Sequence, residues 1–399
     1  MDVSNIPPHP EPEALQDHAQ HLGRRPPGCE RLALLLQGGG ALGAYQAGVY
    51  QALHEAGLEP DWVAGVSIGG INSAIIAGNP PERRLERLRE FWETITARRI
   101  WAYNPDGDAW RKMYNAWSAF TTMTQGQPGF FTVNQPTPLL SPRGAKTATS
   151  YYDNAPLRET LLRLIDFDLL NRGKTRFACG VVNIATGNFV YIDNAIGEIL
   201  PEHVMASGAL PPALPMMKIG TDYFWDGGLV SNTPLQHVLD HIGSDNTLAF
   251  QVDLFSARGA IPRDMAEVTA RQKDIMYSSR TRLTTDHYRQ TYMLKKRMRD
   301  LLARIPEADL REEDMALKRQ VSDLPQISII QLIYQQAAYE GDAKDYEFSA
   351  TSMREHWDSG YRDTERSIMQ KDWIAIPPSD VGLKMHDVHR LTDLARAGA

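Results

Sequence analysis

The chain has 399 residues, 42% of them hydrophobic and 23% charged, with a formal net charge of −7, which is the composition of an ordinary globular protein. Its two cysteines, Cys29 and Cys179, lie far apart in the sequence and lack any metal-ligand spacing, so no disulfide framework is expected and a reducing, cytoplasmic compartment is. No apolar run approaches the roughly 20 residues needed to span a bilayer, so any membrane contact is expected to be peripheral.

The first 250 residues combine a polar leader with alternating strand and helix patterns. Residues 1–30 are Pro-rich and lack the apolar core of a signal peptide, so they are predicted to form a disordered tail. Arg31 to Leu36 reads as a buried strand, followed by a glycine-rich stretch and a helix from about Leu42 to Ala56. Residues 61–66 form a second apolar strand, followed by a helix from Gly69 onward. This alternation predicts an α/β fold on a partly parallel sheet.

Aromatic side chains crowd the next region. Eight of the chain's thirty-four aromatic residues lie between Trp101 and Phe131. Two interpretations stay open, a lid or cap over a binding site and a satellite of the hydrophobic core, because aromatic enrichment marks both.

The later part of the chain changes from strands to helices. Two strands joined by a tight turn are predicted between Thr175 and Asp193, and another strand at Thr247 to Phe255. Beyond residue 258 the pattern is mainly helical, except for a strand candidate at Gln326 to Tyr334 that would extend the sheet. Between Arg271 and Arg304, ten Lys and Arg residues stand against three Asp. This local charge of +7 suits anionic lipid, nucleic acid or, most commonly, a solvated helix face.

The first motif with chemical content is GGGALG, residues 38–43, directly after the first strand. Consecutive glycines suit backbone that turns tightly or lies against a ligand. A phosphate cradle, an oxyanion hole and a plain turn are all open at this point.

The second motif, GVSIG, residues 65–69, has the G-x-S-x-G form and falls between an apolar strand and a helix. A strained strand-to-helix turn lifts the serine hydroxyl out of the sheet, and Gly65 and Gly69 are needed because the backbone passes close to itself. The context predicts Ser67 as a nucleophile, against the alternative of a structural turn.

A serine nucleophile needs a base, and none of the eleven histidines stands in a position typical of a catalytic triad. Asp226 is the better candidate, because an apolar, aromatic strand delivers it directly before Gly227 and Gly228. An isolated D-G-G sequence is a common turn, so its weight comes from the other two motifs.

The three motifs in this order, GGGALG, GVSIG and DGGLVSNTPL (residues 226–235), resemble those of the patatin-like phospholipases, a family of lipid acyl hydrolases. The resemblance covers roughly Arg31 to Phe255. It implies a three-layer α/β/α fold around a central, mainly parallel sheet, and a Ser67–Asp226 catalytic dyad. Asn232 and Pro234 match the N-x-P that commonly follows the family's D-G-G. The implied oxyanion hole is lined by Gly38, Gly39, Gly40 and Gly43.

The resemblance also divides the chain. Residues 31–257 are expected to form the catalytic domain, with an aromatic-rich cap inserted at about 100–150. Residues 258–399 resemble the mainly helical extension of one bacterial subgroup and are expected to pack on that domain. Leu42 departs from the family, which often has Arg or Lys there. Activity is still expected, because an oxyanion hole is built chiefly from backbone N–H groups.

The implied function is hydrolysis of fatty-acyl esters in phospholipids or related lipids through an acyl-enzyme, without metal, cofactor or nucleic acid. An Asp with its ordinary pKa is a weak base. This mechanism therefore requires that the surroundings, such as Phe224 and Trp225, or closure around the substrate desolvate Asp226 and raise its pKa. The runner-up is a short-chain or hydroxyalkanoate-oligomer carboxylesterase using the same dyad. A phosphate-binding protein is disfavoured, since the glycine loop lacks the G-K-[ST] ending, and a non-catalytic lipid-binding protein would leave both dyad residues unexplained.

Overall fold

A computed structural model describes residues 25–97, 107–279, 281–337 and 339–387, so most of the predicted N-terminal tail lies outside the described residues. At its centre is a nine-stranded sheet with the order β11-β10-β9-β1-β2-β5-β8-β7, and β6 also pairs with β5. The strands are β1 (Arg31–Leu36), β2 (Trp62–Val66), β5 (Arg176–Asn183), β6 (Phe189–Asp193), β7 (Met217–Ile219), β8 (Asp222–Asp226), β9 (Thr247–Asp253), β10 (Ile327–Ile333) and β11 (Leu383–Asp387). A separate hairpin-like pair joins β3 (Thr132–Val133) to β4 (Tyr152–Asp153).

The sheet is parallel from β11 to β5 and antiparallel where β6, β7 and β8 join it. The predicted α/β fold with a mainly parallel sheet is confirmed. The strand predicted at residues 326–334 is β10, which extends the main sheet beside β9. The sheet therefore continues past residue 257, where the sequence suggested a domain boundary. β11 was not predicted, because an edge strand with the sequence LKMHD lacks a continuous apolar run.

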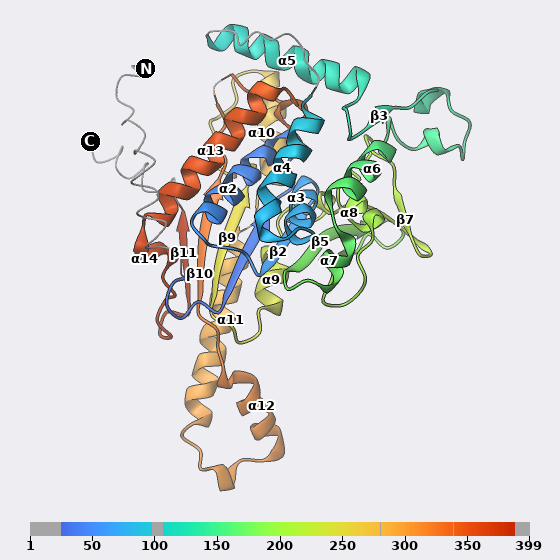
Figure 1. Ribbon diagram of the computed structural model, residues 1–399. Coiled ribbons are helices and arrows are strands. Elements are labelled where there is room, and N and C mark those ends of the chain that lie inside the picture. The colour runs from blue at the N-terminus through green and yellow to red at the C-terminus, as the bar shows by residue number, and fades with distance from the viewer. Residues whose placement is uncertain (1–24, 98–106, 280, 338, 388–399) are drawn as a thin grey trace.

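Helices cover both faces of the sheet (Figure 1). On one face lie α2, α3, α4 and α13, and on the other lie α9 and part of α11. The helices are α2 (Ala44–Glu55), α3 (Ile68–Ala77), α4 (Pro81–Ile95), α5 (Asp108–Gln125), α6 (Ala155–Leu164), α7 (Phe167–Arg172), α8 (Pro201–Ser207), α9 (Leu235–His241), α10 (Met265–Tyr277), α11 (Thr281–Leu302), α12 (Glu312–Ser322), α13 (Ala350–Ile368) and α14 (Lys371–Ile374). Short 3₁₀ turns are η2 (Gly40–Gly43), η3 (Pro138–Leu140), η4 (Lys146–Ala148), η5 (Gly227–Leu229), η6 (Glu307–Asp309) and η7 (Lys344–Tyr346).

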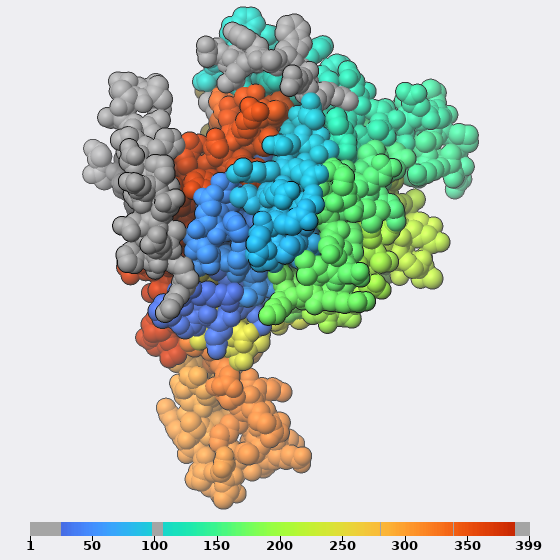
Figure 2. Space-filling model, viewed as in Figure 1, coloured from blue at the N-terminus to red at the C-terminus, as the bar shows by residue number. Residues whose placement is uncertain are grey.

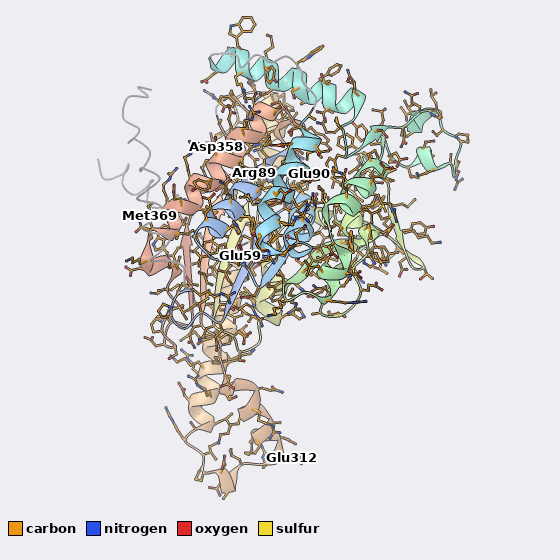
Figure 3. All side chains as sticks on the ribbon, in the orientation of Figure 1. Glu59, Arg89, Glu90, Glu312, Asp358 and Met369 are labelled. Atoms are coloured by element: carbon orange, nitrogen blue, oxygen red, sulfur yellow. The ribbon has the colours of Figure 1, made fainter. Side chains whose placement is uncertain are left out.

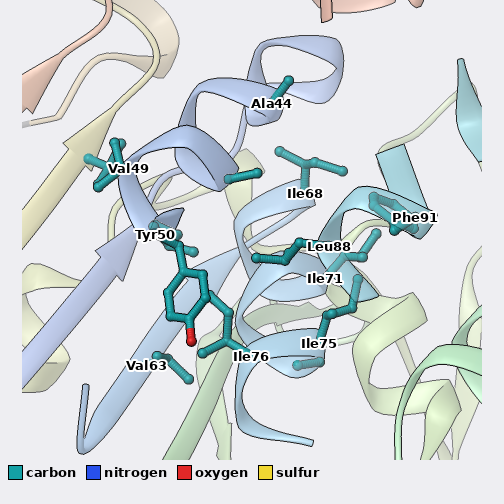
Figure 4. Close-up of a cluster of buried hydrophobic side chains, with 14 of the residues drawn as sticks. Ala44, Val49, Tyr50, Val63, Ile68, Ile71, Ile75, Ile76, Leu88 and Phe91 are labelled. Carbon is teal, nitrogen blue, oxygen red and sulfur yellow. The ribbon is translucent and has the colours of Figure 1, made fainter. Parts of the chain in front are cut away.

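The period-two geometry of β1 explains the two faces. Leu32, Leu34 and Leu36 belong to the larger core under α2, α3 and α4, whereas Ala33 and Leu35 belong to the smaller core under α9. Figure 4 shows part of the larger core, where side chains of α2, α3 and α4 meet above the sheet. Each large apolar side chain buried there contributes about 1.5–3 kcal/mol to stability.

The C-terminal helix α13 packs on α2 with almost no space between the two backbones. A Cβ added to Gly48 would lie 1.9 Å from the Trp357 carbonyl oxygen, and one added to Gly360 would lie 2.0 Å from the Tyr45 carbonyl oxygen. Small residues at both crossing points allow this approach. The C-terminal region is therefore part of the layer that covers the sheet.

The helices α11 and α12 form an arm that projects from the end of the molecule opposite α5, with Glu312 near its tip (Figures 1, 2 and 3). Two leucines of this arm, Leu294 and Leu301, are 60% and 58% exposed, whereas the adjacent Leu302 is buried. In the preceding part of the basic segment, Lys273 pairs with Asp345 at 2.7 Å, so not all of its charge faces solvent. In the described ranges, no helix is both long and apolar enough to cross a bilayer.

Candidate functional site

Ser67 lies at the sharp turn between β2 and α3. Its φ of 56° makes it the only non-glycine residue with a positive φ in the described part of the chain. A Cβ on Gly65 would lie 2.2 Å from the Gly69 carbonyl carbon, and one on Gly69 would lie 2.2 Å from the Leu36 carbonyl oxygen. Both flanking glycines are therefore sterically required, as the motif predicted, and the turn holds Ser67 in a strained conformation typical of functional sites.

A second serine, which the sequence analysis missed, supports this turn. The Ser67 N–H donates to the Ser207 Oγ at 3.1 Å, and the Ser207 hydroxyl donates to the Gly180 carbonyl at 2.8 Å. Ser207 is fully buried at the end of α8. It carries no local sequence signal, because its importance comes from packing against a residue 140 positions away.

The sheet register brings Asp226 to Ser67. β2 pairs with one edge of β5 and ends at Val66 opposite Gly180. The other edge of β5 is occupied by β6, so β8 pairs with the same edge as β2, from Val181 onward. β8 runs antiparallel to β5 and ends at Asp226. The ends of β2 and β8 therefore meet, and the two predicted dyad residues lie together.

The Asp226 side chain is buried, with 1% of its surface exposed. This burial raises its pKa to about 7, because a carboxylate is poorly solvated there. The adjacent Ser67 hydroxyl and the N–H of Gly228, which donates to Oδ1 at 2.7 Å, favour the charged form but only partly offset the burial. The sequence analysis required a raised pKa at this position, and the structure has one.

The four glycines expected to line an oxyanion hole differ in their environments. The Gly38 N–H donates to the Asn232 carbonyl at 3.3 Å. Gly39 and Gly40 line the same cavity as Ser67, and their N–H groups donate no hydrogen bond to any described residue. Gly43 does not line this cavity, and a Cβ there would lie 2.6 Å from Ile68 Cγ1. Among these four glycines, Gly39 and Gly40 therefore combine a place in the cavity wall with an N–H that has no partner in the described part of the chain.

The glycine loop is held by side-chain amides. Asn232 donates from Nδ2 to the carbonyls of Gly38 and Tyr277, each at 3.0 Å. Gln37 accepts the N–H of Leu254 at 2.6 Å and donates to Thr233 at 3.0 Å. These bonds fix the loop in position before any ligand binds.

Leu42, which departs from the resemblance, is fully buried in the larger core and does not line the cavity. The presence of Leu42, where the family often has Arg or Lys, therefore places no apolar side chain beside Ser67.

Ser67 and Asp226 open into a cavity of about 90 Å³ whose walls are mostly apolar. Phe130 and Phe131, from the aromatic-rich region, belong both to this wall and to the core. For these two residues, the interpretation as part of a binding-site cover and the interpretation as part of the core therefore apply together. Trp101 and Tyr103, from the same region, lie outside the described residues. The apolar and aromatic residues of the wall are Phe130, Phe131, Tyr152, Leu210, Ala213, Leu214, Phe255, Tyr277, Tyr346 and Phe348.

Three of these wall residues, Tyr277, Tyr346 and Phe348, come from the C-terminal region and had no motif to reveal them. No histidine of the described ranges lines the cavity, and His237 instead bonds to Asp193 at 3.1 Å. Within the same ranges, no group of three or more His, Cys, Asp or Glu side chains is arranged to hold a metal ion. Of the two carboxylates that line the cavity, Asp345 pairs with Lys273 at 2.7 Å, and Asp226 is the one that the sheet register brings to Ser67.

Comparisons with known proteins point to one family. A family model described as patatin-like phospholipase matches residues 34–239, and another described as patatin phospholipase matches residues 275–380. A patatin-like phospholipase domain-containing protein of Caenorhabditis elegans is 31% identical over 102 residues, 26% of this chain and 7% of that protein. Patatin-like phospholipase domain-containing protein 6 of Homo sapiens is 42% identical over 67 residues, 16% of this chain and 5% of that protein. The matched region is thus a small part of these relatives.

Among solved structures, VipD from Legionella pneumophila aligns over 94% of this chain and 75% of its own, with 15% identity and a TM-score of 0.33. Because this similarity is low, the fold is assigned from the sheet topology described above. The first family model spans more than half of the chain, from β1 to α9, and includes both Ser67 and Asp226. The chain therefore belongs to the patatin-like phospholipase family, a family of lipid-hydrolysing carboxylic ester hydrolases.

Proposed function

We propose that this protein is a serine lipid acyl hydrolase that cleaves fatty-acyl ester bonds of phospholipids or related lipids through a Ser67–Asp226 dyad. The observation that carries the proposal is the strained Ser67 beside a buried Asp226 in the same apolar cavity. Apolar walls suit a fatty acyl chain, which favours this substrate over the polar oligomers of the runner-up esterase.

The first half of the reaction forms an acyl-enzyme. Ser67 Oγ attacks the ester carbonyl carbon while Asp226 accepts the hydroxyl proton. The carbonyl oxygen becomes negative and accepts hydrogen bonds from the N–H groups of Gly39 and Gly40, each of which is worth about 10²–10³ in rate for such sites. The intermediate collapses, the bond to the leaving oxygen breaks, and Asp226 returns the proton to the departing alcohol.

The second half releases the fatty acid. A water molecule gives a proton to Asp226 and attacks the acyl carbon, and the proton returns to Ser67 as the acyl bond breaks. A pKa of about 7 suits both roles of Asp226, because near neutral pH the carboxylate and the acid are both populated. The proposed substrate lies in a lipid surface, which the protein contacts peripherally.

The test is hydrolysis of p-nitrophenyl esters of increasing chain length, with the wild type beside Ser67→Ala and Asp226→Asn and with chelator present. Activity that peaks at long chains and disappears in both variants supports the proposal. A peak at the shortest esters would favour the runner-up esterase. Activity unaffected by either substitution would exclude the dyad.

A further inference from the structure

Helix α5 has its polarity reversed relative to an ordinary surface helix. The side chains that it buries against the protein are mainly polar: Arg111, Asn115, Ser118, Ala119, Thr121 and Thr122. The side chains on its solvent side include large apolar ones: Trp110 (63% exposed), Met113 (57%), Trp117 (56%), Phe120 (51%) and Met123 (41%). We call these five the outer face of α5. Surface helices usually bury their apolar stripe, so this arrangement calls for an apolar environment outside the molecule.

Specific polar contacts hold α5 in this orientation. Arg111 donates to Ser352 at 3.0 Å and to Glu355 at 2.8 Å, both on α13. Near the other end of the helix, the Tyr152 hydroxyl donates to the Met123 carbonyl at 2.8 Å. Rotating the apolar stripe inward would break the buried Arg111 interactions, so the outer face is a fixed feature of the fold.

The outer face is close to the catalytic cavity. Five residues after the end of α5, Phe130 and Phe131 enter the cavity wall. The turn η7 packs against α5, and its residues Asp345 and Tyr346 line the same cavity. Figure 3 shows side chains projecting from α5 away from the body of the molecule, at the end opposite the α11–α12 arm.

We infer that the outer face of α5 inserts into the surface of a phospholipid bilayer and positions the cavity to receive a lipid. This inference rests on the proposed function, because the substrate class supplies the occupant. Tryptophan, methionine and phenylalanine beside a polar face are typical of helices that lie in a membrane interface. The charge agrees with an anionic surface, since the only acid of α5 is Asp108 at its first residue and the exposed Lys112 adjoins Met113.

The experiment compares vesicle binding with hydrolysis of a soluble ester. The test variant is Trp110→Ser/Trp117→Ser. Its matched control is Leu294→Ser/Leu301→Ser, which removes two apolar side chains of similar exposure from the arm at the opposite end. Binding is measured by co-sedimentation with vesicles of equal parts phosphatidylcholine and phosphatidylglycerol, with Ser67→Ala added to every protein so that the vesicles stay intact. Hydrolysis of p-nitrophenyl butyrate is measured with Ser67 present.

The test variant should bind vesicles at least about tenfold more weakly than the parent. It should hydrolyse the soluble ester at the parental rate. The control should match the parent in both assays. Equal binding by the test variant and the parent would overturn the inference, as would a parent that hydrolyses the ester but does not bind vesicles. A dimeric parent that the tryptophan substitutions make monomeric would assign the face to a second copy of the chain and also overturn it. A parent without esterase activity that still shows tryptophan-dependent binding would contradict the proposed function and leave the docking face supported.

Discussion

Replacing Asp226 by Asn should abolish ester hydrolysis and also stabilise the folded protein at neutral pH. Burial raises the pKa of Asp226 from its ordinary value of 3.8 to about 7. Between these pH values the folded protein holds a proton that the unfolded chain has released, so stability falls by about 1.4 kcal/mol per pH unit as the pH rises. Above pH 7 the accumulated cost reaches about 4 kcal/mol, which Asn, having no charge to bury, does not carry.

The assay is urea unfolding of both proteins at a series of pH values from about 4 to about 8. The difference in unfolding free energy isolates position 226, because the remaining titratable groups are shared. It should be near zero at pH 4 and grow to as much as about 4 kcal/mol in favour of Asn at pH 8. A difference that does not change with pH, or an Asn variant less stable than wild type at pH 8, would refute the argument.

A second buried carboxylate offers a control of opposite sign. Burial alone would raise the pKa of Asp193, but hydrogen bonds from His237 and Arg176 lower it well below the usual range. Its charged form therefore stabilises the folded state above the unfolded-state pKa, and this contribution is lost as the pH falls. Asp193→Asn should accordingly destabilise the protein at neutral pH, which separates the effect of charge burial at Asp226 from a general effect of amide substitution.

Three further predictions concern the same site. Hydrolysis of a soluble ester should rise about tenfold per pH unit below pH 6 and level off above pH 8, because Asp226 must be deprotonated to accept the serine proton; a rate independent of pH in this range would contradict its role as base. Ser67→Gly should be more stable to urea than Ser67→Ala by about 1 kcal/mol, since only glycine adopts a φ of 56° without strain, and equal stabilities would show that the turn is relaxed. Ser207→Ala should destabilise the protein by about 1–3 kcal/mol and lower kcat more than it raises KM, because the Ser67 N–H and the Gly180 carbonyl lose their shared partner; unchanged urea unfolding would show that water replaces the hydroxyl.

The central strands and the turn at Ser67 were predictable because their signals are local. β1 and β2 are continuous apolar runs, as expected of parallel strands buried on both faces, and each is followed by glycines where the backbone turns. The strand-to-helix turn at Ser67 needs small neighbours for reasons contained within five residues. Asp226 became a candidate only in combination, and the sheet register explains why: it meets Ser67 through β5, to which both β2 and β8 pair.

The parts that sequence reasoning missed depend on contacts between distant segments. Ser207, Tyr346 and Phe348 reach the site from elements with no recognisable pattern of their own. The different roles of the glycines within GGGALG also depend on such distant contacts. Nothing in GGGALG distinguishes Gly40, which lines the cavity, from Gly43, which makes room for Ile68, because that difference is set by what packs against each residue.

Helix α5 shows why apolar side chains at helical spacing do not by themselves reveal which way they face. Trp110, Met113, Trp117 and Phe120 recur at three- and four-residue intervals, which identifies one face of a helix and equally suits a core stripe or an external one. What decides between them is the opposite face, where Arg111 finds its partners on α13, more than 200 residues later in the chain. A charged side chain with buried, well-placed partners orients the helix, and the apolar stripe then faces outward as a consequence. Polar contacts can thus expose an apolar surface in this fold. Because this surface lies near the apolar cavity, it agrees with the proposed hydrolysis of membrane lipids.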